Sequence, residues 1–206
     1  MGCSVRKSNK CADGIGVNNG KYTARNGSKN RKEYTLWQNM LKRCTIKFQT
    51  ESPSYVGTTC SENFKSYEYF YEWCQRQTGF GNIDENNRGW HLDKDLLVKG
   101  NKIYSEDTCC FIPQTINSLL IRSGSRAGRF LLGVYWDKHH RKFISQCNDS
   151  KGKRVKLGLY NEEKDAFIAY KTYKEALIKE VASEYKDRVD ENVYKALINY
   201  NLEETD

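Results

Sequence analysis

The spacing of apolar residues predicts two amphipathic helices in the first half of the chain. In residues 33–45 the apolar positions recur every three or four residues, which places them on one helical face: Leu36, Trp37, Met40, Leu41 and Cys44. Residues 62–77 show the same spacing and turn these side chains inward: Phe64, Tyr67, Phe70 (or Tyr71) and Cys74. We expect both faces to pack as core, because an apolar stripe at helical spacing normally faces other apolar residues.

A sequence of short elements follows in residues 90–117. The pattern predicts, in order, a strand at 90–92, the charged cluster Asp93-Lys94-Asp95, a loop at 99–102, a strand at 108–112 and a helix that Pro113 opens and that carries Asn117. Proline suits the first helical position, because the N–H that it lacks would be unpaired there. The region is therefore strand, loop, strand, helix.

The second half of the chain predicts a three-stranded sheet followed by helices. The expected elements are strands at 133–137, 142–148 and 154–158, a helix capped by Asn161, and further helix through 174–206. Together with the first half, this pattern predicts the α+β fold class. The predicted division is a basic, irregular arm at 1–32, a domain at 33–121, a linker at 122–129 and a second domain at 130–206 with a helical tail.

The two-residue period of a strand assigns the side chains of the predicted sheet to its two faces. The side chains expected to face the helix are Val134, Trp136, Phe143, Ser145, Cys147, Val155 and Leu157. Those expected to face outward are Tyr135, Asp137, Ile144, Gln146, Asn148, Arg154 and Lys156. Cations, amides and a branched apolar side chain suit phosphates and base edges. The sequence therefore predicts DNA binding by Tyr135, Ile144, Gln146, Asn148, Arg154 and Lys156.

The net charge of +8 is concentrated in two segments of the 206-residue chain. Residues 1–32 hold eight basic residues and one acidic residue, and residues 122–160 hold ten and two. Concentrated positive charge points to a nucleic-acid partner. Arg122, Arg126 and Arg129 are expected to lie along a DNA backbone. No apolar run has the length of a membrane span, so we expect no membrane partner and a place inside the cell.

The eight cysteines include no CxxC pair. Cys109 and Cys110 are adjacent, so on a strand their side chains point to opposite faces. Reduced cysteines that pack as small apolar groups are the favoured interpretation. A zinc site built from Cys44, Cys60 and Cys109 is the alternative.

The order of elements in residues 90–117 resembles the ββα-metal fold of the HNH nucleases, in particular the phage and intron homing endonucleases. The resemblance implies that Asp93, at the end of the first strand, and Asn117, on the helix, would hold a Mg²⁺ ion. In that family a histidine general base follows the aspartate, whereas this chain has Lys94. The departure falls on the residue that activates water.

Lysine is poorly suited to that task. A general base must be neutral near pH 7, and the adjacent carboxylates Asp93 and Asp95 favour the charged form of Lys94. A lysine cation would hold a phosphate well and activate water poorly. His91, two residues before Asp93 and so on the same strand face, is the alternative base.

Residues 130–173 resemble the plant ethylene-response-factor (Apetala-type) DNA-binding domain, which also occurs attached to HNH homing endonucleases of phages. The resemblance rests on the order of three strands and a helix, with Gly133-Val134 near its start, Leu157-Gly158 closing the third strand and Ala169-Tyr170 in an Ala-rich helix. It implies that the outward face of the sheet lies in the DNA major groove. Several positions that are Arg or Trp in that family differ here, so its sequence preference does not carry over.

Two functions follow from these patterns. The favoured hypothesis is a sequence-specific double-stranded DNA-binding protein, descended from a homing endonuclease, that acts as a repressor does by occupying its site. The alternative is an active Mg²⁺-dependent homing or nicking endonuclease. An RNA-binding role is less favoured, because Tyr135 is the one aromatic residue expected on the outward face. The expected setting is the cytoplasm of a bacterial host near the nucleoid, with the C-terminal helices as a possible contact between two copies.

Overall fold

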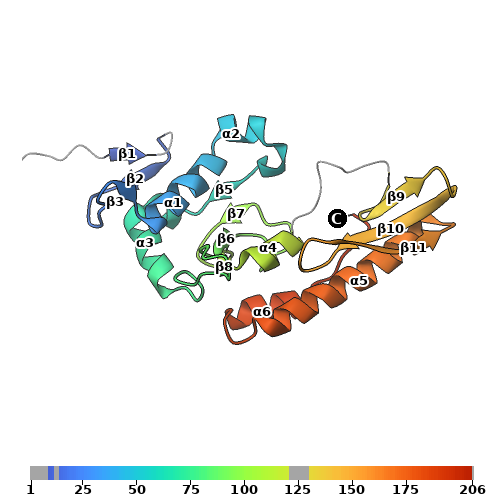
Figure 1. Ribbon diagram of the computed structural model, residues 1–206. Helices are drawn as coiled ribbons and strands as arrows, with labels where there is room; N and C mark the ends of the chain where they lie inside the picture. The colour runs from blue at the N-terminus through green and yellow to red at the C-terminus, as the bar shows by residue number, and fades with distance from the viewer. Residues whose placement is uncertain (1–8, 12–13, 121–129, 206) are drawn as a thin grey trace, which may run out of the picture. The chain divides into compact units, whose positions relative to one another are not determined.

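The computed structural model describes residues 9–11, 14–120 and 130–205. Helices and small sheets alternate along the chain, so the fold is α+β (Figure 1). The chain divides into two compact units, residues 1–111 and 112–206. Each unit has its own core and is described by itself below.

The core of the first unit is aromatic. It forms where helix α1 (Lys32–Arg43) packs on helix α3 (Tyr67–Arg76), and its fully buried side chains include Trp37, Met40, Leu41, Phe64, Tyr67 and Phe70. The rings of Phe64 and Phe70 meet edge to face at 5.1 Å between centroids, and the indole N–H of Trp37 donates to the carbonyl of Phe64 at 2.8 Å. The second predicted face is therefore confirmed as core, and the first is confirmed at Trp37, Met40 and Leu41, whereas Leu36 and Cys44 are half-buried.

The second predicted helix is shorter than expected. Residues 62–77 split into a 3₁₀ turn, η2 (Asn63–Lys65), and α3, because Ser66 is the N-cap of α3 and its side chain accepts the Tyr69 N–H. Serine bonds to the backbone in this way at the start of a helix rather than inside it.

The predicted irregular arm differs from the structure over residues 14–32. Strand β1 (Asn9–Cys11) pairs with β2 (Gly16–Asn18), and β3 (Arg25–Asn26) pairs with β4 (Lys29–Asn30) in a two-stranded hairpin. Gly16 packs on α1 so closely that a Cβ there would lie 2.4 Å from the Leu41 side chain and 2.5 Å from that of Trp37. Residues far along the chain thus hold Gly16 and its strand in place.

The remainder of the first unit is built from short elements. Helix α2 (Ile46–Glu51) and the 3₁₀ turn η1 (Pro53–Tyr55) lead to β5 (Thr59–Cys60), which pairs in parallel with β7 (Ile103–Tyr104). Strand β6 (His91–Asp93) pairs with β8 (Cys110–Ile112). The predicted strands are confirmed as β6 and β8, whereas the sequence did not predict the pairing of β5 with β7.

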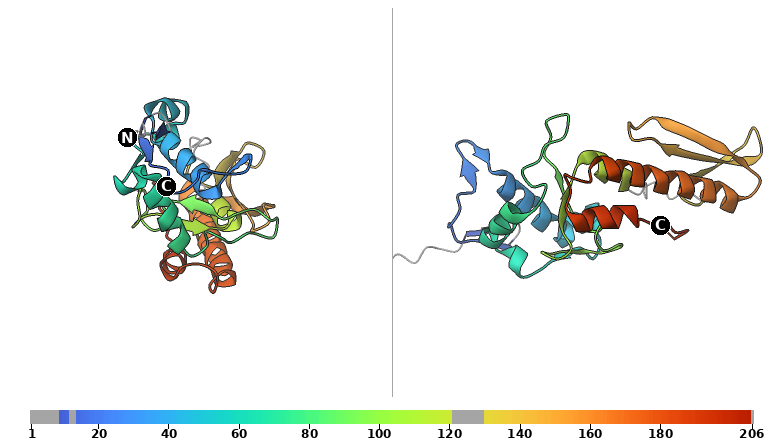
Figure 2. Two further views of the ribbon diagram at one scale, coloured as in Figure 1. Left: turned by 90° about the vertical axis from the view of Figure 1, so that its left-hand side faces the viewer. Right: turned by 90° about the horizontal axis from the view of Figure 1, so that it is seen from below.

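The second unit is a three-stranded antiparallel sheet on a long helix. After helix α4 (Gln114–Leu120), strands β9 (Val134–Asp137), β10 (Lys142–Asn148) and β11 (Arg154–Tyr160) form a sheet with β10 at its centre. The sheet lies on helix α5 (Glu163–Glu184), and helix α6 (Glu191–Ile198) packs on α5 (Figure 2). These elements confirm the predicted order of strands and helices.

Two details of the second unit differ from the prediction. The N-cap of α5 is Glu162 rather than Asn161, and its side chain makes no capping hydrogen bond. Instead the Glu163 carboxylate accepts the Leu131 N–H at 2.5 Å, which ties the first turn of the helix to the segment before β9.

Within the described residues, no helix is both long and apolar enough to cross a membrane.

The contact between sheet and helix requires glycine at position 133. Buried Val134 and Cys147 of the sheet pack with Ala166, Phe167 and Tyr170 of α5. Gly133 has φ +76°, and a Cβ there would lie 2.0 Å from the ring of Tyr170. Both the left-handed backbone and the close approach therefore exclude a side chain.

We predict that Gly133→Ala lowers the free energy of unfolding by at least about 2 kcal/mol, because left-handed strain and overpacking each cost about 1 kcal/mol or more. Gly152→Ala is the matched control: Gly152 has φ +80°, but a Cβ there meets nothing within 4 Å. The control should lose only the strain term of about 1 kcal/mol. Urea unfolding of both variants measures the difference, and equal losses would contradict the Tyr170 contact.

Candidate functional site

The outward face of the β9–β11 sheet brings together the six residues predicted to bind DNA. The register pairs Tyr135 with Ile144, Gln146 with Lys156, and Asn148 with Arg154. Their neighbours Val134 and Cys147 are buried against α5, so alternation turns the six side chains away from the helix. Tyr135, Asn148, Arg154 and Lys156 are exposed, and Ile144 and Gln146 are half-buried.

A β-bulge adds a residue that sequence reasoning missed. The register shifts between Ser145 and Gln146, so Leu157 has no opposite partner and packs into the core. Beyond the bulge Ile144 pairs with Leu159, which therefore faces outward. Tyr135, Ile144 and Leu159 form a row across the three strands. The predicted strand ended at Gly158, and the apolar pair Leu159-Tyr160 was the signal that it continues.

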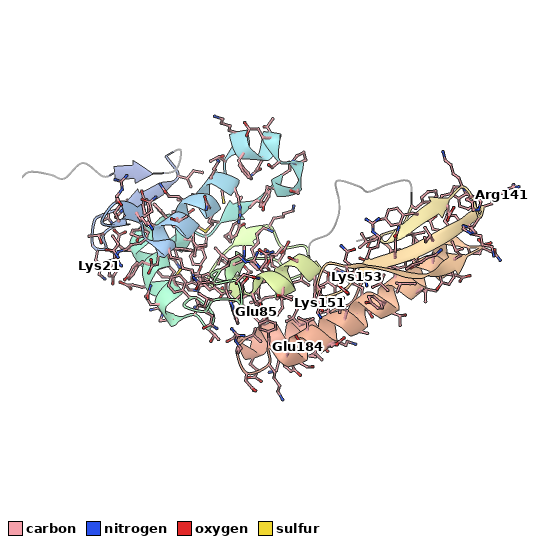
Figure 3. All side chains as sticks on the ribbon, viewed as in Figure 1. Lys21, Glu85, Arg141, Lys151, Lys153 and Glu184 are labelled. Atoms are coloured by element: carbon pink, nitrogen blue, oxygen red, sulfur yellow. The ribbon has the colours of Figure 1, made fainter. Side chains whose placement is uncertain are left out.

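Basic side chains surround this row. Residues 134–160 hold seven of them: Lys138, Arg141, Lys142, Lys151, Lys153, Arg154 and Lys156. Arg141 lies in the turn at one end of the sheet, and Lys151 and Lys153 lie in the turn at the other end (Figure 3). In the part of the chain that the structure describes, none of the seven forms an ion pair, and all of them are exposed except the half-buried Lys142.

The two acidic residues of this segment are engaged by the turns themselves. Asp137 Oδ1 accepts the N–H groups of His139 and His140, and its Oδ2 lies 2.9 Å from His140 Nδ1. The hydrogen bonds from His140 lower the pKa of Asp137. Asp149 Oδ1 accepts the N–H groups of Lys151 and Lys153 at 2.9 and 2.8 Å. Both carboxylates hold turns, as aspartate does where the backbone reverses.

Trp136 is more exposed than predicted. It was expected to face the helix, yet 41% of its surface is exposed. The ring lies edge to face against Phe143, at 4.9 Å between centroids. β9 is an edge strand, so a neighbouring strand covers only one side of the indole.

Arg122, Arg126 and Arg129, which were predicted to contact the DNA backbone, lie outside the described residues.

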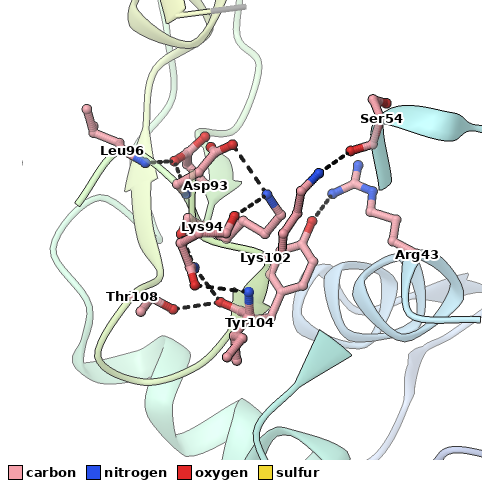
Figure 4. Close-up of polar contacts among 11 residues, drawn as sticks. Arg43, Ser54, Asp93, Lys94, Leu96, Lys102, Tyr104 and Thr108 are labelled. Carbon is pink, nitrogen blue, oxygen red and sulfur yellow. Dashed lines mark hydrogen bonds and ion pairs between the residues drawn. The ribbon is translucent and has the colours of Figure 1, made fainter. Parts of the chain in front are cut away.

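The Asp93 cluster of the first unit forms a hydrogen-bonded loop (Figure 4). Asp93 Oδ1 accepts the N–H groups of Asp95 and Leu96 at 3.1 and 2.8 Å. Burial, and then the neighbouring Asp95 carboxylate, raise the pKa of Asp93 to about 6. The two backbone hydrogen bonds act in the opposite direction but do not outweigh burial.

Lys94, predicted to occupy the position of the general base, is buried within this loop. Its ammonium donates to the Asn101 carbonyl at 3.1 Å and to Asp95 Oδ2 at 3.3 Å. The Asn101 amide donates back to the Lys94 carbonyl at 2.6 Å. These hydrogen bonds of Lys94 hold the loop together. Nearby Lys102 donates to the Ser54 carbonyl (Figure 4).

His91 lies on β6, two residues before Asp93. Burial, and then the positive charge of Arg88, lower the pKa of His91, which keeps its imidazole neutral at pH 7. Asp93 belongs to the first unit, whereas Asn117 lies on α4 of the second, so their pairing stays a prediction.

The Asp93 cluster does not by itself fit a Mg²⁺ ion. The Oδ1 atom of Asp93 already accepts two N–H groups, and the Lys94 ammonium lies beside the second carboxylate. Among residues 9–11, 14–120 and 130–205, no group of three or more His, Cys, Asp or Glu side chains could hold a metal ion. Cys44, Cys60 and Cys109, the predicted zinc ligands, are among these residues and form no such group. The neighbouring Cys60 thiol raises the pKa of Cys44, whose Sγ donates to the Met40 carbonyl at 3.3 Å, and Cys109 is buried.

Comparison of the chain with protein-family models, curated proteins and solved structures gives no match.

We predict that Asp93→Asn stabilises the protein at pH 7.5. Asparagine accepts the same two N–H bonds but carries no charge. Because the folded-state pKa of Asp93 is raised to about 6, the stability from its protonated form is complete below about pH 4 and is lost as the pH rises through 6. The free energy of unfolding of the variant should be about 1–3 kcal/mol higher than that of the native chain at pH 7.5, and nearly equal to it at pH 4.

Urea unfolding between pH 4 and 8 measures this difference. Glu85→Gln, which removes one exposed carboxylate from the same unit, is the control and should change stability by less than about 0.5 kcal/mol. A less stable Asp93→Asn variant at pH 7.5 would show that the ionised carboxylate holds the loop.

Proposed function

We propose that this protein binds double-stranded DNA through the outward face of the β9–β11 sheet and acts by occupying its site. The observation that carries the proposal is the composition of that face. An apolar row and two amides lie at its centre, seven basic residues lie in its strands and turns, and both acidic residues are engaged in turns. The resemblance of residues 130–173 to the ethylene-response-factor domain supports the same conclusion.

The dimensions of the sheet suit the major groove. Strands lie about 4.8 Å apart, so the outer two of three strands are roughly 10 Å apart, against a groove about 12 Å wide. Gln146 and Asn148 carry amides of the kind that pair with adenine edges, and Ile144 with Leu159 offers apolar contact to thymine methyl groups. Arg154, Lys156 and the lysines of the turns would lie against phosphates. Helix α5 covers the opposite face and leaves the outward one to DNA.

We predict that the double variant Arg154→Ala/Lys156→Ala weakens duplex binding by about tenfold or more at 150 mM salt. It should also reduce the slope of log Kd against log salt by about two, since each lost phosphate contact removes close to one. The probe is a duplex selected by the full chain from a random library. Fluorescence anisotropy at several salt concentrations gives both quantities.

Lys164→Ala/Lys179→Ala is the matched control, because it removes the same charge from exposed positions of α5. We expect its affinity to change by less than about threefold, since neither lysine would contact a phosphate. Equal losses in the two double variants would mean that net charge, rather than the sheet face, governs binding.

A metal-dependent nuclease is the second candidate function, favoured by the neutral His91 imidazole on the same strand as Asp93. Because the Asp93 cluster does not fit an ion by itself, cleavage is not part of our proposal. With Mg²⁺ or Mn²⁺ we expect the native chain to nick supercoiled plasmid carrying the selected site no faster than His91→Ala. Metal-dependent nicking that His91→Ala abolishes would establish the nuclease instead.

A further inference from the structure

A cleft of about 600 Å³ opens in the first unit, where α1 faces the β3–β4 hairpin. It is an open groove rather than an enclosed pocket, so a ligand in it would stay partly exposed to solvent. The side chains that matter for its chemistry come from β2, β3, β4, α1 and the segment between β2 and β3: Asn18, Tyr22, Arg25, Asn30, Tyr34 and Gln38. None of them belongs to the proposed DNA-binding face.

The walls of the cleft are held in place by α3. The Glu68 carboxylate accepts the N–H groups of Asn19 and Gly20 at 2.6 and 3.1 Å. The Tyr22 hydroxyl donates to Glu72 at 2.9 Å, and the Tyr22 ring stacks on Tyr71 at 3.9 Å between centroids. These contacts tie the segment after β2 to α3.

Among the described residues, the charged side chain that lines the cleft is Arg25. The carboxylate of Glu72 is paired with Lys21 at 2.6 Å, whereas that of Glu68 accepts backbone N–H groups and keeps its negative charge. Arg25 is exposed and lines the cleft. A guanidinium in this position suits a phosphate, with which it forms two parallel hydrogen bonds.

The interior of the cleft combines phenol rings with amides. Tyr22, with one ring face stacked on Tyr71, and Tyr34, with its ring edge to face against Tyr67, line the cleft with phenol rings against which a planar ring could pack. Asn18, Asn30 and Gln38 carry amides, which can donate and accept hydrogen bonds to the edge of a heterocyclic base, although Asn18 Oδ1 already accepts the Gly20 N–H at 2.9 Å. No aspartate or glutamate lines the cleft among the described residues. A planar heterocycle joined to a phosphate satisfies all three kinds of group.

We propose that this cleft binds a nucleotide, with its base against the phenol rings and amides and its phosphate at Arg25. The nucleotide can be free or can belong to a single strand of nucleic acid, because both present the same groups. The proposal is independent of duplex binding by the sheet, which uses other residues.

The test uses the full chain and two probes, deoxyadenosine monophosphate and a fluorescein-labelled single-stranded pentanucleotide of mixed sequence. We expect saturable binding that Arg25→Ala weakens by about tenfold and Gln38→Ala by roughly three- to tenfold, since each removes one recognised group. Lys47→Ala, which removes one exposed charge from α2 of the same unit, should change affinity by less than about twofold. Titration calorimetry and anisotropy measure these constants.

The pattern of results separates the sources of the nucleotide. Equal affinity for both probes identifies a free nucleotide, and tighter binding of the pentanucleotide identifies a single strand. The proposal is overturned if neither probe saturates at millimolar concentration, or if Arg25→Ala and Lys47→Ala weaken binding equally. Arg154→Ala/Lys156→Ala should retain nucleotide binding, so loss of one activity does not imply loss of the other.

Discussion

The packing of the β9–β11 sheet on α5 is the contact on which the second unit depends. Tyr170 of the helix lies directly over Gly133, and Val134 and Cys147 fill the space beside it. Because side chains alternate along a strand, burying these residues commits their neighbours to the opposite face. Arg154 and the other polar residues of that face are therefore positioned by the core beneath them rather than by contacts of their own. A surface held in this way can meet a partner without first having to order itself.

Hydrogen bonds inside the protein decide which charges remain for a partner. In the first unit, Lys94 and Lys21 are engaged by a carbonyl and by carboxylates of the same unit. In the sheet the situation is reversed, since Asp137 and Asp149 are engaged by turns while the basic side chains face solvent. A count of charges along the sequence does not separate these two situations. The local folding of each segment does, and this difference is the basis of our proposal that the sheet is the interface.

The spacing of apolar residues predicted most of the helices and strands, but not the features that depend on contacts between distant segments. The helical stripe that includes Trp37 and the alternation in β10 placed the helices, the sheet and the six outward residues. The bulge at Ser145 depends on pairing between strands, so the outward position of Leu159 could not be read from a two-residue period. Similarly, Gly16 is ordered by a helix that begins sixteen residues later. The cleft at Arg25 was missed because its walls come from segments that only the folded chain brings together.

The most direct test of the central claim is lysine footprinting of the full chain with and without its selected duplex. An amine-reactive reagent labels exposed lysines, and mass spectrometry reports which of them the DNA protects. The account predicts protection of Lys151, Lys153 and Lys156 in the sheet and its turn, and unchanged labelling of Lys164 and Lys179 on α5. Protection of the α5 lysines with full labelling of the sheet would contradict it, since the DNA would then lie on the opposite face.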